Sequence, residues 1–272
     1  DVCSSDLNNM AKLREKFWLW GQSPDSHAVH KVPPSRMTAM EGCACFGIDR
    51  CCRVVMCSHP RPPFDQESIA MEPLKEVVWS IVGACGTVEN NNGKGDIDEV
   101  LRQADLFSNV TGGVLDDFFV SRERRDAFPP EALAEIRRRL KTEAKRPLDL
   151  WVVVYATNLE LPVKEYLDLC DVITFWTWKS EDLVKMQENF DRLIEMTPGK
   201  RHLNGCYMYD YGNNRPMELS VMKKQAKQYE EWMLSGKSDG LVLCSNCCAD
   251  VGLETVPWTK QWLREIGNIE LK

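Results

Sequence analysis

The sequence predicts an α/β fold in which eight strand–helix units close into a single-domain (β/α)8 barrel. Three observations carry this prediction. Eight short apolar runs alternate with helical patterns along 272 residues, which is the length and order that such a barrel needs. The runs are apolar nearly throughout, as is typical of strands covered on both faces of a parallel sheet. An open, doubly wound sheet is the alternative, and it is disfavoured because the Gly-rich first turn of that fold is missing.

The strands are expected where apolar runs are bounded by turn residues. The first run, FWLWG, spans 17–21, and the eighth, GLVLC, spans 240–244. The six strands between them are expected at 51–57, 77–83, 110–118, 150–155, 172–178 and 203–209.

Helices are expected between the strands, each with a recognisable start. Ser35 is the expected N-cap of a helix through Met37, Met40 and Cys43. Acidic residues from Asp96 onward suit the positive end of another helix. Further helices are expected at 131–145 after two prolines, from Ser180 onward, at 216–234 and at 256–266. The strands and helices therefore alternate to the end of the chain.

Composition excludes several classes of protein. Hydrophobic residues make up 43% of the chain, which is too many for a disordered protein. No run approaches the roughly 18–20 apolar residues of a membrane span. The formal charge of −7, without a run of Lys or Arg, argues against nucleic acid and anionic membranes as partners.

The first residues are set apart from the fold. Residues 1–7, DVCSSDL, look like the translated adapter of a sequencing library attached to a metagenomic gene fragment; a disordered polar tail is the alternative. The barrel domain is then expected to span 8–272. A signal peptide would have been lost with the true start, so periplasmic, secreted and cytoplasmic locations all stay open.

The C-terminal ends of the predicted strands carry the polar and aromatic residues expected of a site, since barrel enzymes build their sites there. These side chains are carboxylates, aromatics, imidazoles and amides: Trp20, His27, His30, His59, Glu89, Asp116, Asp117, Tyr155, Asn158, Trp176, Trp178, Tyr207, Tyr209, Asp210, Tyr211 and Asn246. The opposite ends carry mostly plain polar caps. This asymmetry is the main indication of function.

Three aspartates are the candidate catalytic residues. Asp116 and Asp117 follow the fourth strand and Asp210 follows the seventh, so carboxylates from these two strands are expected to face each other across a substrate. Such a pair supplies the acid and the nucleophile or base of glycoside hydrolysis. Neighbouring side chains alternate on an extended backbone, so only one of Asp116 and Asp117, with Asp116 favoured, is expected to aim into the pocket. The alternative is that they cap the loop or pair with nearby arginines.

Aromatic and amide side chains are the candidate substrate-binding residues. Flat rings at the strand ends suit the faces of sugars, which points to Trp20, Trp176, Trp178, Tyr155 and Tyr209. Trp79 and Trp151 are expected in the core instead. The substrate hydroxyls are expected to be recognised by hydrogen-bonding side chains, namely His27, His59, Asn158 and Asn246.

No cofactor and no metal are expected. A metal site built from His27, His30, His59 and Asp116 is an alternative, but the spacing matches no metallohydrolase signature. The cysteines gather at 43–57 and 244–248, and most are expected to be free, buried thiols, with a disulfide involving Cys247 or Cys248 left open.

Four segments carry a resemblance to a known group of proteins. The runs WLWGQSPDSH, GGVLDDFF, YLDLCDVITFWTW and DVGLETVPWTKQWL resemble bacterial TIM-barrel proteins grouped with glycoside hydrolases, and the likeness extends from Lys12 to Gly267. It implies a carbohydrate-active barrel from a polysaccharide-degrading bacterium, with a poly- or oligosaccharide as substrate. Many retaining barrel glycosidases carry Glu after strands 4 and 7, whereas both positions are Asp in this chain.

Three functions therefore stay under consideration. The first is a glycoside hydrolase that uses Asp210 with Asp116 or Asp117. The second is a barrel that binds carbohydrate without catalysis, and the third is a metal-dependent hydrolase, lyase or isomerase. The sequence does not indicate the oligomeric state.

Overall fold

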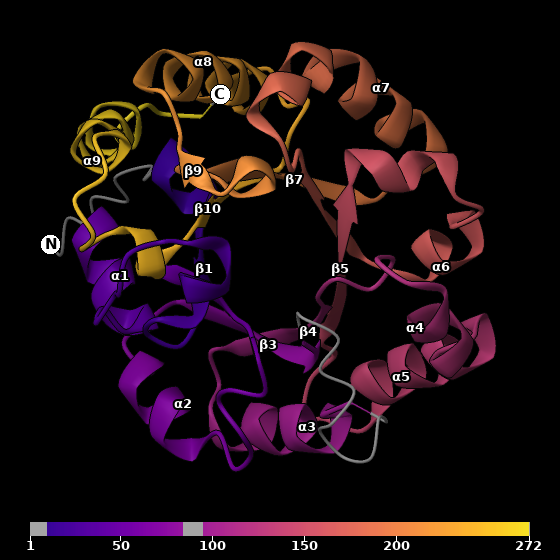
Figure 1. Ribbon diagram of the computed structural model, residues 1–272. Helices are drawn as coiled ribbons and strands as arrows, with labels where there is room; N and C mark the ends of the chain where they lie inside the picture. Colours follow the sequence, from indigo (N-terminus) through magenta and orange to yellow (C-terminus); the bar gives the residue numbers. More distant parts are fainter. Residues whose placement is uncertain (1–9, 84–94, 272) are drawn as a thin grey trace, which may run out of the picture.

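The computed structural model describes residues 10–83 and 95–271, and these form a closed barrel of parallel strands surrounded by helices (Figure 1). Around the barrel the strands run in the order β1-β10-β7-β6-β5-β4-β3-β2. Their bounds are β1 Phe17–Gly21, β2 Arg50–Arg53, β3 Glu76–Val82, β4 Val110–Leu115, β5 Asp149–Tyr155, β6 Val172–Trp176, β7 Arg201–Tyr207 and β10 Gly240–Cys244. The predicted single-domain (β/α)8 barrel is confirmed. The expectations for residues 1–7 and for Glu89 lie outside the described residues.

Helices form the outer layer and follow the strands in turn (Figure 1). Their bounds are α1 Ala39–Phe46, α2 Asp65–Met71, α3 Ile97–Leu106, α4 Arg122–Ala127, α5 Pro130–Thr142, α6 Lys164–Leu169, α7 Met186–Met196, α8 Leu219–Leu234 and α9 Thr255–Ile266. Short 3-10 helices lie in the loops: η1 Leu13–Lys16, η2 Ser26–His30, η4 Ala156–Glu160, η5 Ser180–Lys185, η6 Tyr211–Asn213 and η7 Asn246–Cys248. A small antiparallel pair, β8 Tyr209–Asp210 and β9 Arg215–Pro216, follows β7.

The predicted strands run too far at their C-terminal ends. The strands predicted at 51–57, 110–118, 172–178 and 203–209 end at Arg53, Leu115, Trp176 and Tyr207. Most of the apolar residues beyond these points are still buried, so burial alone did not mark where the ladder of hydrogen bonds stops. The residues that leave the sheet here form the loops around the site.

One predicted helix cap is wrong. Helix α1 begins after Thr38, not after Ser35, because the Thr38 side chain accepts a hydrogen bond from the backbone N–H of Glu41, 3.2 Å away. The Glu41 carboxylate in turn accepts the backbone N–H of Thr38 at 2.8 Å. This reciprocal capping box satisfies two backbone donors of the first turn, which a single Ser cap does not do.

Tryptophans from opposite sides of the barrel fill its interior in two layers. Trp18 of β1 contacts Trp151 of β5, with ring centroids 4.8 Å apart, and Trp20 of β1 contacts Trp176 of β6 at 5.3 Å. Glycine makes room for the upper layer, because a Cβ atom on Gly205 would lie 2.0 Å from the Trp176 ring. The expectation that Trp151 packs in the core is confirmed. The barrel is therefore solid below the level of Trp20.

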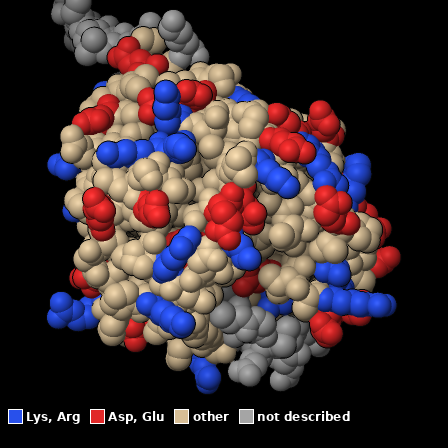
Figure 2. Space-filling view, turned by 45° about the horizontal axis from the view of Figure 1, so that its top comes forward, with Lys and Arg blue, Asp and Glu red and all other residues tan. Residues whose placement is uncertain are grey.

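Charged side chains of both signs are mixed over the face seen in Figure 2, without a continuous patch of one sign. Within the described ranges, no helix is both long and apolar enough to cross a membrane.

Candidate active site

A cavity of about 560 Å³ opens at the C-terminal ends of the barrel strands. Most of its lining surface is apolar. Its lining residues come from the ends of the strands and the loops after them: Trp20, Gln22, His27, His30, Met56, Asp116, Asp117, Phe119, Val120, Tyr155, Thr157, Asn158, Leu161, Trp178, Lys179, Asp182, Tyr207, Tyr211 and Cys244. The position is the one that barrel enzymes use for catalysis.

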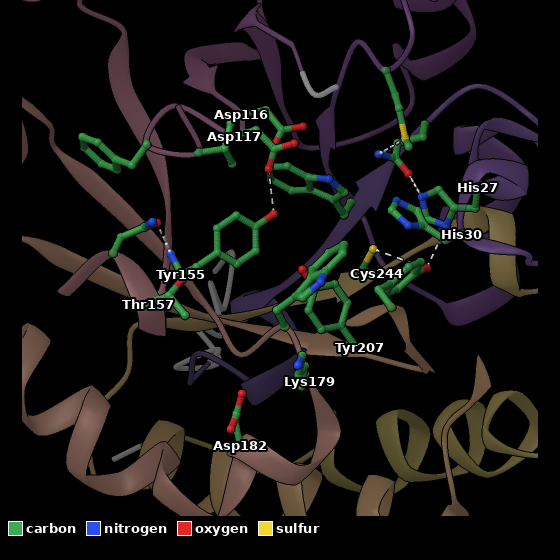
Figure 3. A pocket seen from close by; sticks show the side chains of 18 of the residues that line it. His27, His30, Asp116, Asp117, Tyr155, Thr157, Lys179, Asp182, Tyr207 and Cys244 are labelled. Atoms are coloured by element: carbon green, nitrogen blue, oxygen red, sulfur yellow. Dashed lines mark hydrogen bonds between the residues drawn. The ribbon is translucent and has the colours of Figure 1, made fainter. Parts of the chain in front are cut away.

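Asp116 and Asp117 both line this cavity and lie side by side after β4 (Figure 3). The expectation that only one of them faces the pocket is wrong. It assumed an extended backbone, but β4 ends at Leu115 and Asp117 has a φ of 47°, in the left-handed region. This turn of the backbone brings two successive carboxyl groups to one wall.

Asp116 is the more deeply placed of the two. It is 3% exposed, and its Oδ2 atom has no hydrogen-bond partner among the described residues. Burial, and then the charge of Asp117, raise the pKa of Asp116 well above its usual value. The backbone N–H of Asp117 and the charge of Arg124 oppose this change without cancelling it. Asp116 therefore keeps its proton to a higher pH than an ordinary aspartate does.

Asp117 is held by a tyrosine from the next strand. The hydroxyl of Tyr155, at the end of β5, donates to Oδ1 of Asp117 over 2.8 Å (Figure 3). Burial, followed by the nearby charge of Asp117, raises the pKa of Tyr155 well above its usual value, so the hydroxyl keeps its proton and stays a donor. The two carboxyl groups thus have unlike surroundings, which is the condition for separate acid and base roles.

Aromatic rings from β1, β6 and β7 and their loops form one side of the cavity. Trp178 stacks on Tyr211, with centroids 5.8 Å apart and planes 26° from parallel. Tyr207 lies 4.9 Å from Tyr211, and the imidazole of His30 meets both Trp178 and Tyr211 edge-on at 5.4 Å. Trp20 closes the floor. Burial lowers the pKa of His30, against the opposing effects of Asn214 and Asp117.

His27 is part of a buried hydrogen-bond network beneath these rings. Its Nε2 atom bonds the side-chain oxygen of Gln22, so Nε2 carries the proton and Nδ1 accepts the Tyr211 hydroxyl at 2.7 Å. The Tyr211 oxygen also lies 3.0 Å from the Cys248 sulfur. Burial, and then the charge of His30, lower the pKa of His27 to about 3. His27 therefore stays neutral and holds Gln22 and Tyr211 in place.

Asp210 does not line the cavity. It is 1% exposed, and its carboxylate accepts the Ser180 hydroxyl at 2.7 Å, the Asn213 amide at 2.9 Å and the Arg215 guanidinium at 3.1 Å. Burial raises the pKa of Asp210, but these hydrogen bonds outweigh it and lower that pKa below its usual value. The Asp210 carboxylate thus connects the β8–β9 hairpin to the loop after β6 and does not lie opposite Asp116.

Four predicted substrate-binding residues also lie outside the cavity lining. His59 is exposed in a tight turn that pairs with Met56, and Trp176 is buried under Trp20 inside the barrel. Tyr209 donates to the backbone oxygen of His30 at 3.0 Å. Asn246 is fully buried and bonds the backbone of Gln22. The predicted residues that do line the cavity are Trp20, His27, Asp116, Asp117, Tyr155, Asn158 and Trp178.

Some lining residues were not among the predicted site residues. Tyr207, Tyr211 and His30 stood among the strand-end residues but were not selected, although each is a polar aromatic beside an apolar run. Lys179 and Asp182 lie together on the side of the cavity away from Asp116 and Asp117 (Figure 3). They follow β6 at the start of η5, where the sequence pattern indicates only a helix start.

The described cysteines are free thiols, most of them buried. Cys244 lines the cavity, and burial raises the pKa of its thiol well above the usual value. Within residues 10–83 and 95–271, no group of three or more His, Cys, Asp or Glu side chains is arranged to hold a metal ion.

The fold and the site together define a (β/α)8 barrel with a carboxyl-bearing, aromatic cavity at its C-terminal end. No family model matches the sequence, and no curated protein matches it significantly. Solved structures are similar in fold. The catalytic domain of a chitinase from Pyrococcus furiosus has a TM-score of 0.59 and 14% identity, over 96% of this chain and 99% of that one.

Two further structures show the range of that likeness. An endo-β-N-acetylglucosaminidase mutant from Cordyceps militaris, in complex with fucosyl-N-acetylglucosamine-Asn, has a TM-score of 0.57 and 12% identity, over 92% of this chain and 90% of that one. A tryptophan synthase structure from M. tuberculosis has a TM-score of 0.52 and 13% identity, over 96% of this chain and 95% of that one. At such identities the likeness establishes the fold, and the reaction must be argued from the site.

Proposed function

We propose that this protein is a glycoside hydrolase and that Asp116 is its proton donor. The observation that carries the proposal is the buried carboxyl of Asp116, with its raised pKa, beside the hydrogen-bonded carboxyl of Asp117 at the C-terminal end of β4 in an aromatic cavity. A carboxyl group kept neutral by its surroundings is what protonation of a glycosidic oxygen requires. The glycosidases among the structural neighbours support the class of reaction.

The aromatic side of the cavity suits a sugar ring. Trp178 is partly exposed and presents ring surface together with its indole N–H, while Tyr207 and Trp20 also line the cavity but are only 6% and 4% exposed. Sugar rings expose C–H faces that pack on such surfaces, while their hydroxyl groups need hydrogen-bond partners. His30 lies within the same wall and supplies a ring nitrogen. In this placement the anomeric carbon lies close to Asp116 and Asp117.

The mechanism also needs a group that attacks the anomeric carbon. Glycosidases that use two carboxylates place them about 5–9.5 Å apart on opposite sides of the bond, whereas Asp116 and Asp117 are neighbours on one wall. Asp182, on the far side, is exposed on η5. We therefore assign the attack on the anomeric carbon to an N-acetyl group of the substrate itself, with Asp117 holding its amide N–H. The N-acetylglucosamine ligand named for one neighbour supports this choice.

The proposal is tested with aryl N-acetyl-β-D-glucosaminides and chito-oligosaccharides, by following released aglycone and reducing sugar. The native protein is expected to hydrolyse at least one of them, and Asp116→Asn to lower kcat by about a hundredfold or more. Asp182→Asn is the matched control and is expected to retain activity. Equal losses in both variants would make Asp182 the second catalytic group. Binding without hydrolysis by the native protein would contradict the proposal and favour a carbohydrate-binding barrel.

A further inference from the structure

The cavity has two unlike halves, which meet at the Tyr155–Asp117 hydrogen bond. Figure 3 shows Thr157 on one side of this bond and His27 and His30 on the other. The aromatic half, described above, comes from β1, β6, β7 and their loops. The other half, the β4–β5 half, comes from the loops after β4 and β5: Phe119, Val120, Thr157, Asn158 and Leu161.

The β4–β5 half is uncharged and mainly apolar in its described lining. Val120 is 53% exposed, and Leu161, which lines the same cavity, is partly exposed. The amide oxygen of Asn158 already accepts the backbone N–H of Tyr155 at 2.8 Å. The ring of Phe119 is only 2% exposed, so it offers little face to a sugar. An aliphatic surface is thus open to solvent three residues after Asp117.

Exposed aliphatic side chains within a cavity are a place where an apolar group of a ligand can be buried. If the sugar lies on the aromatic half, the oxygen that Asp116 protonates lies at the boundary, and the departing group extends over Val120 and Leu161. A departing sugar would need stacking rings and hydroxyl partners, and this half offers one hydroxyl, that of Thr157, and no accessible ring among its described residues. An apolar group would instead remove Val120 from water.

We infer that the β4–β5 half is an aglycone site, and that the substrate is a glycoside whose leaving group is an apolar alcohol instead of a further sugar. This inference rests on the proposed function and narrows its substrate class. It places Val120 as a specificity-determining residue. In this cleavage the acetamido oxygen of the substrate bonds to the anomeric carbon while the C–O bond to the alcohol breaks, and the proton of Asp116 goes to the departing oxygen. Water then adds to the anomeric carbon, the acetamido oxygen is released, and a proton of that water returns to Asp116.

The test is a series of alkyl N-acetyl-β-D-glucosaminides from methyl to hexyl. Their alcohols have nearly equal acidity, so the chemical step stays constant while the apolar area grows. Because each methylene that leaves water is favoured, kcat/KM is expected to rise about two- to fourfold per carbon over the first few carbons. In Val120→Ser, kcat/KM is expected to increase less with each added carbon. Val184→Ser is the matched control, since Val184 is 84% exposed on η5 outside the cavity lining, and it should keep the native slope.

The outcomes separate this inference from the proposed function. If methyl and hexyl glycosides are hydrolysed at equal kcat/KM, or if a chito-oligosaccharide is preferred to both, the aglycone site is wrong and the glycosidase stands. If none of them is hydrolysed, the glycosidase proposal fails. The aglycone site is then tested separately, by calorimetric measurement of how tightly Asp116→Asn binds the methyl and hexyl glycosides. Tighter binding of the hexyl compound, lost in Val120→Ser, supports the site; equal binding overturns it.

Discussion

The hydroxyl of Tyr155 donates a 2.8 Å hydrogen bond to Oδ1 of Asp117, and this contact joins the ends of β5 and β4 in the wall of the cavity. It leaves Asp116, one residue earlier, as the carboxyl group without such a donor on Oδ2. Two adjacent aspartates thus have different hydrogen-bond surroundings, and the pKa of the buried Asp116 is raised. The proposed division of roles follows from this difference.

Tyr155→Phe is expected to lower kcat and leave KM nearly unchanged. The substitution removes the hydroxyl but keeps the ring that meets Trp178 edge-on at 5.8 Å. A hydrogen bond to a charged group contributes about 1.5–3 kcal/mol, so the loss should be about ten- to hundredfold in kcat. Steady-state kinetics against the control Tyr229→Phe, a buried tyrosine of α8, measures it. An unchanged kcat would show that the contact does not position Asp117.

The buried carboxyl of Asp116 should make the protein less stable as the pH rises. In the unfolded chain this group ionises near about pH 3.9, whereas its pKa in the folded protein is raised. Above pH 3.9 the folded state therefore holds more protons, and the free energy of unfolding falls by up to about 1.4 kcal/mol per pH unit until the folded pKa is passed. Asp116→Asn should remove this contribution, as chemical unfolding at several pH values will show.

A surface carboxylate provides the comparison for that experiment. Asp168→Asn alters an exposed group that pairs with Lys164. In this variant the free energy of unfolding should change with pH as it does in the native protein. If the free energies of unfolding of the native protein and Asp116→Asn differ by the same amount at every pH, the raised pKa of Asp116 is contradicted.

His27 should contribute a pH dependence of the opposite sign. Its pKa in the folded protein is lowered to about 3, while the unfolded side chain titrates near about 6.5. As the pH falls below 6.5 the unfolded chain takes up a proton that the folded protein does not, so stability is lost by up to about 1.4 kcal/mol per unit. His27→Gln should lessen this loss in acid unfolding, whereas the exposed His59→Gln should not. Equal acid sensitivity of both variants would be evidence against a buried, neutral His27.

Asp210→Asn is expected to weaken the fold and spare the chemistry. The carboxylate connects Ser180, Asn213 and Arg215, and the amide cannot accept all of these bonds. The expected loss in the free energy of unfolding is about 1–3 kcal/mol, with kcat of the folded protein changed little. Parallel unfolding and kinetic measurements decide the matter. A loss in kcat like that of Asp116→Asn, at native stability, would restore Asp210 as a catalytic residue.

Gly205→Ala should destabilise the barrel because its new methyl group meets the Trp176 ring at 2.0 Å. Overpacking of a dense core costs about 1–3 kcal/mol or more. Trp176→Leu removes the obstructing ring, so the double variant should lose less than the sum of the two single variants. Additive losses in chemical unfolding would mean that Gly205 and Trp176 do not share this space.

The barrel was predictable from the sequence because its signal is spread over many residues. Runs such as LWVVVY in β5 are buried on both faces, and each run is followed by a helix, so several local errors leave the topology unchanged. The exact strand ends were not predictable. Residues 54–56 are as buried as β2 itself, although the strand ends at Arg53.

The site was predictable in position but not in detail. The acidic pair after β4 was visible because charges beside an apolar run must be partnered or solvated. The left-handed backbone at Asp117, which turns both carboxyl groups the same way, is not indicated by the run Leu-Asp-Asp-Phe. The role of Asp210 depends on Arg215 folding back beside it in the β8–β9 pair, a contact that strand patterns do not indicate.

The central claim, that Asp116 delivers the proton to the leaving group, is tested most directly by varying that group in the Asp116→Asn protein. With an alkyl glycoside, whose alkoxide cannot leave unprotonated, the variant should lose about a hundredfold or more in kcat/KM relative to the native protein. With a dinitrophenyl glycoside of the same sugar, which needs no proton, the loss should be less than about tenfold. Equal losses on the two substrates would contradict the assignment of Asp116 as the acid.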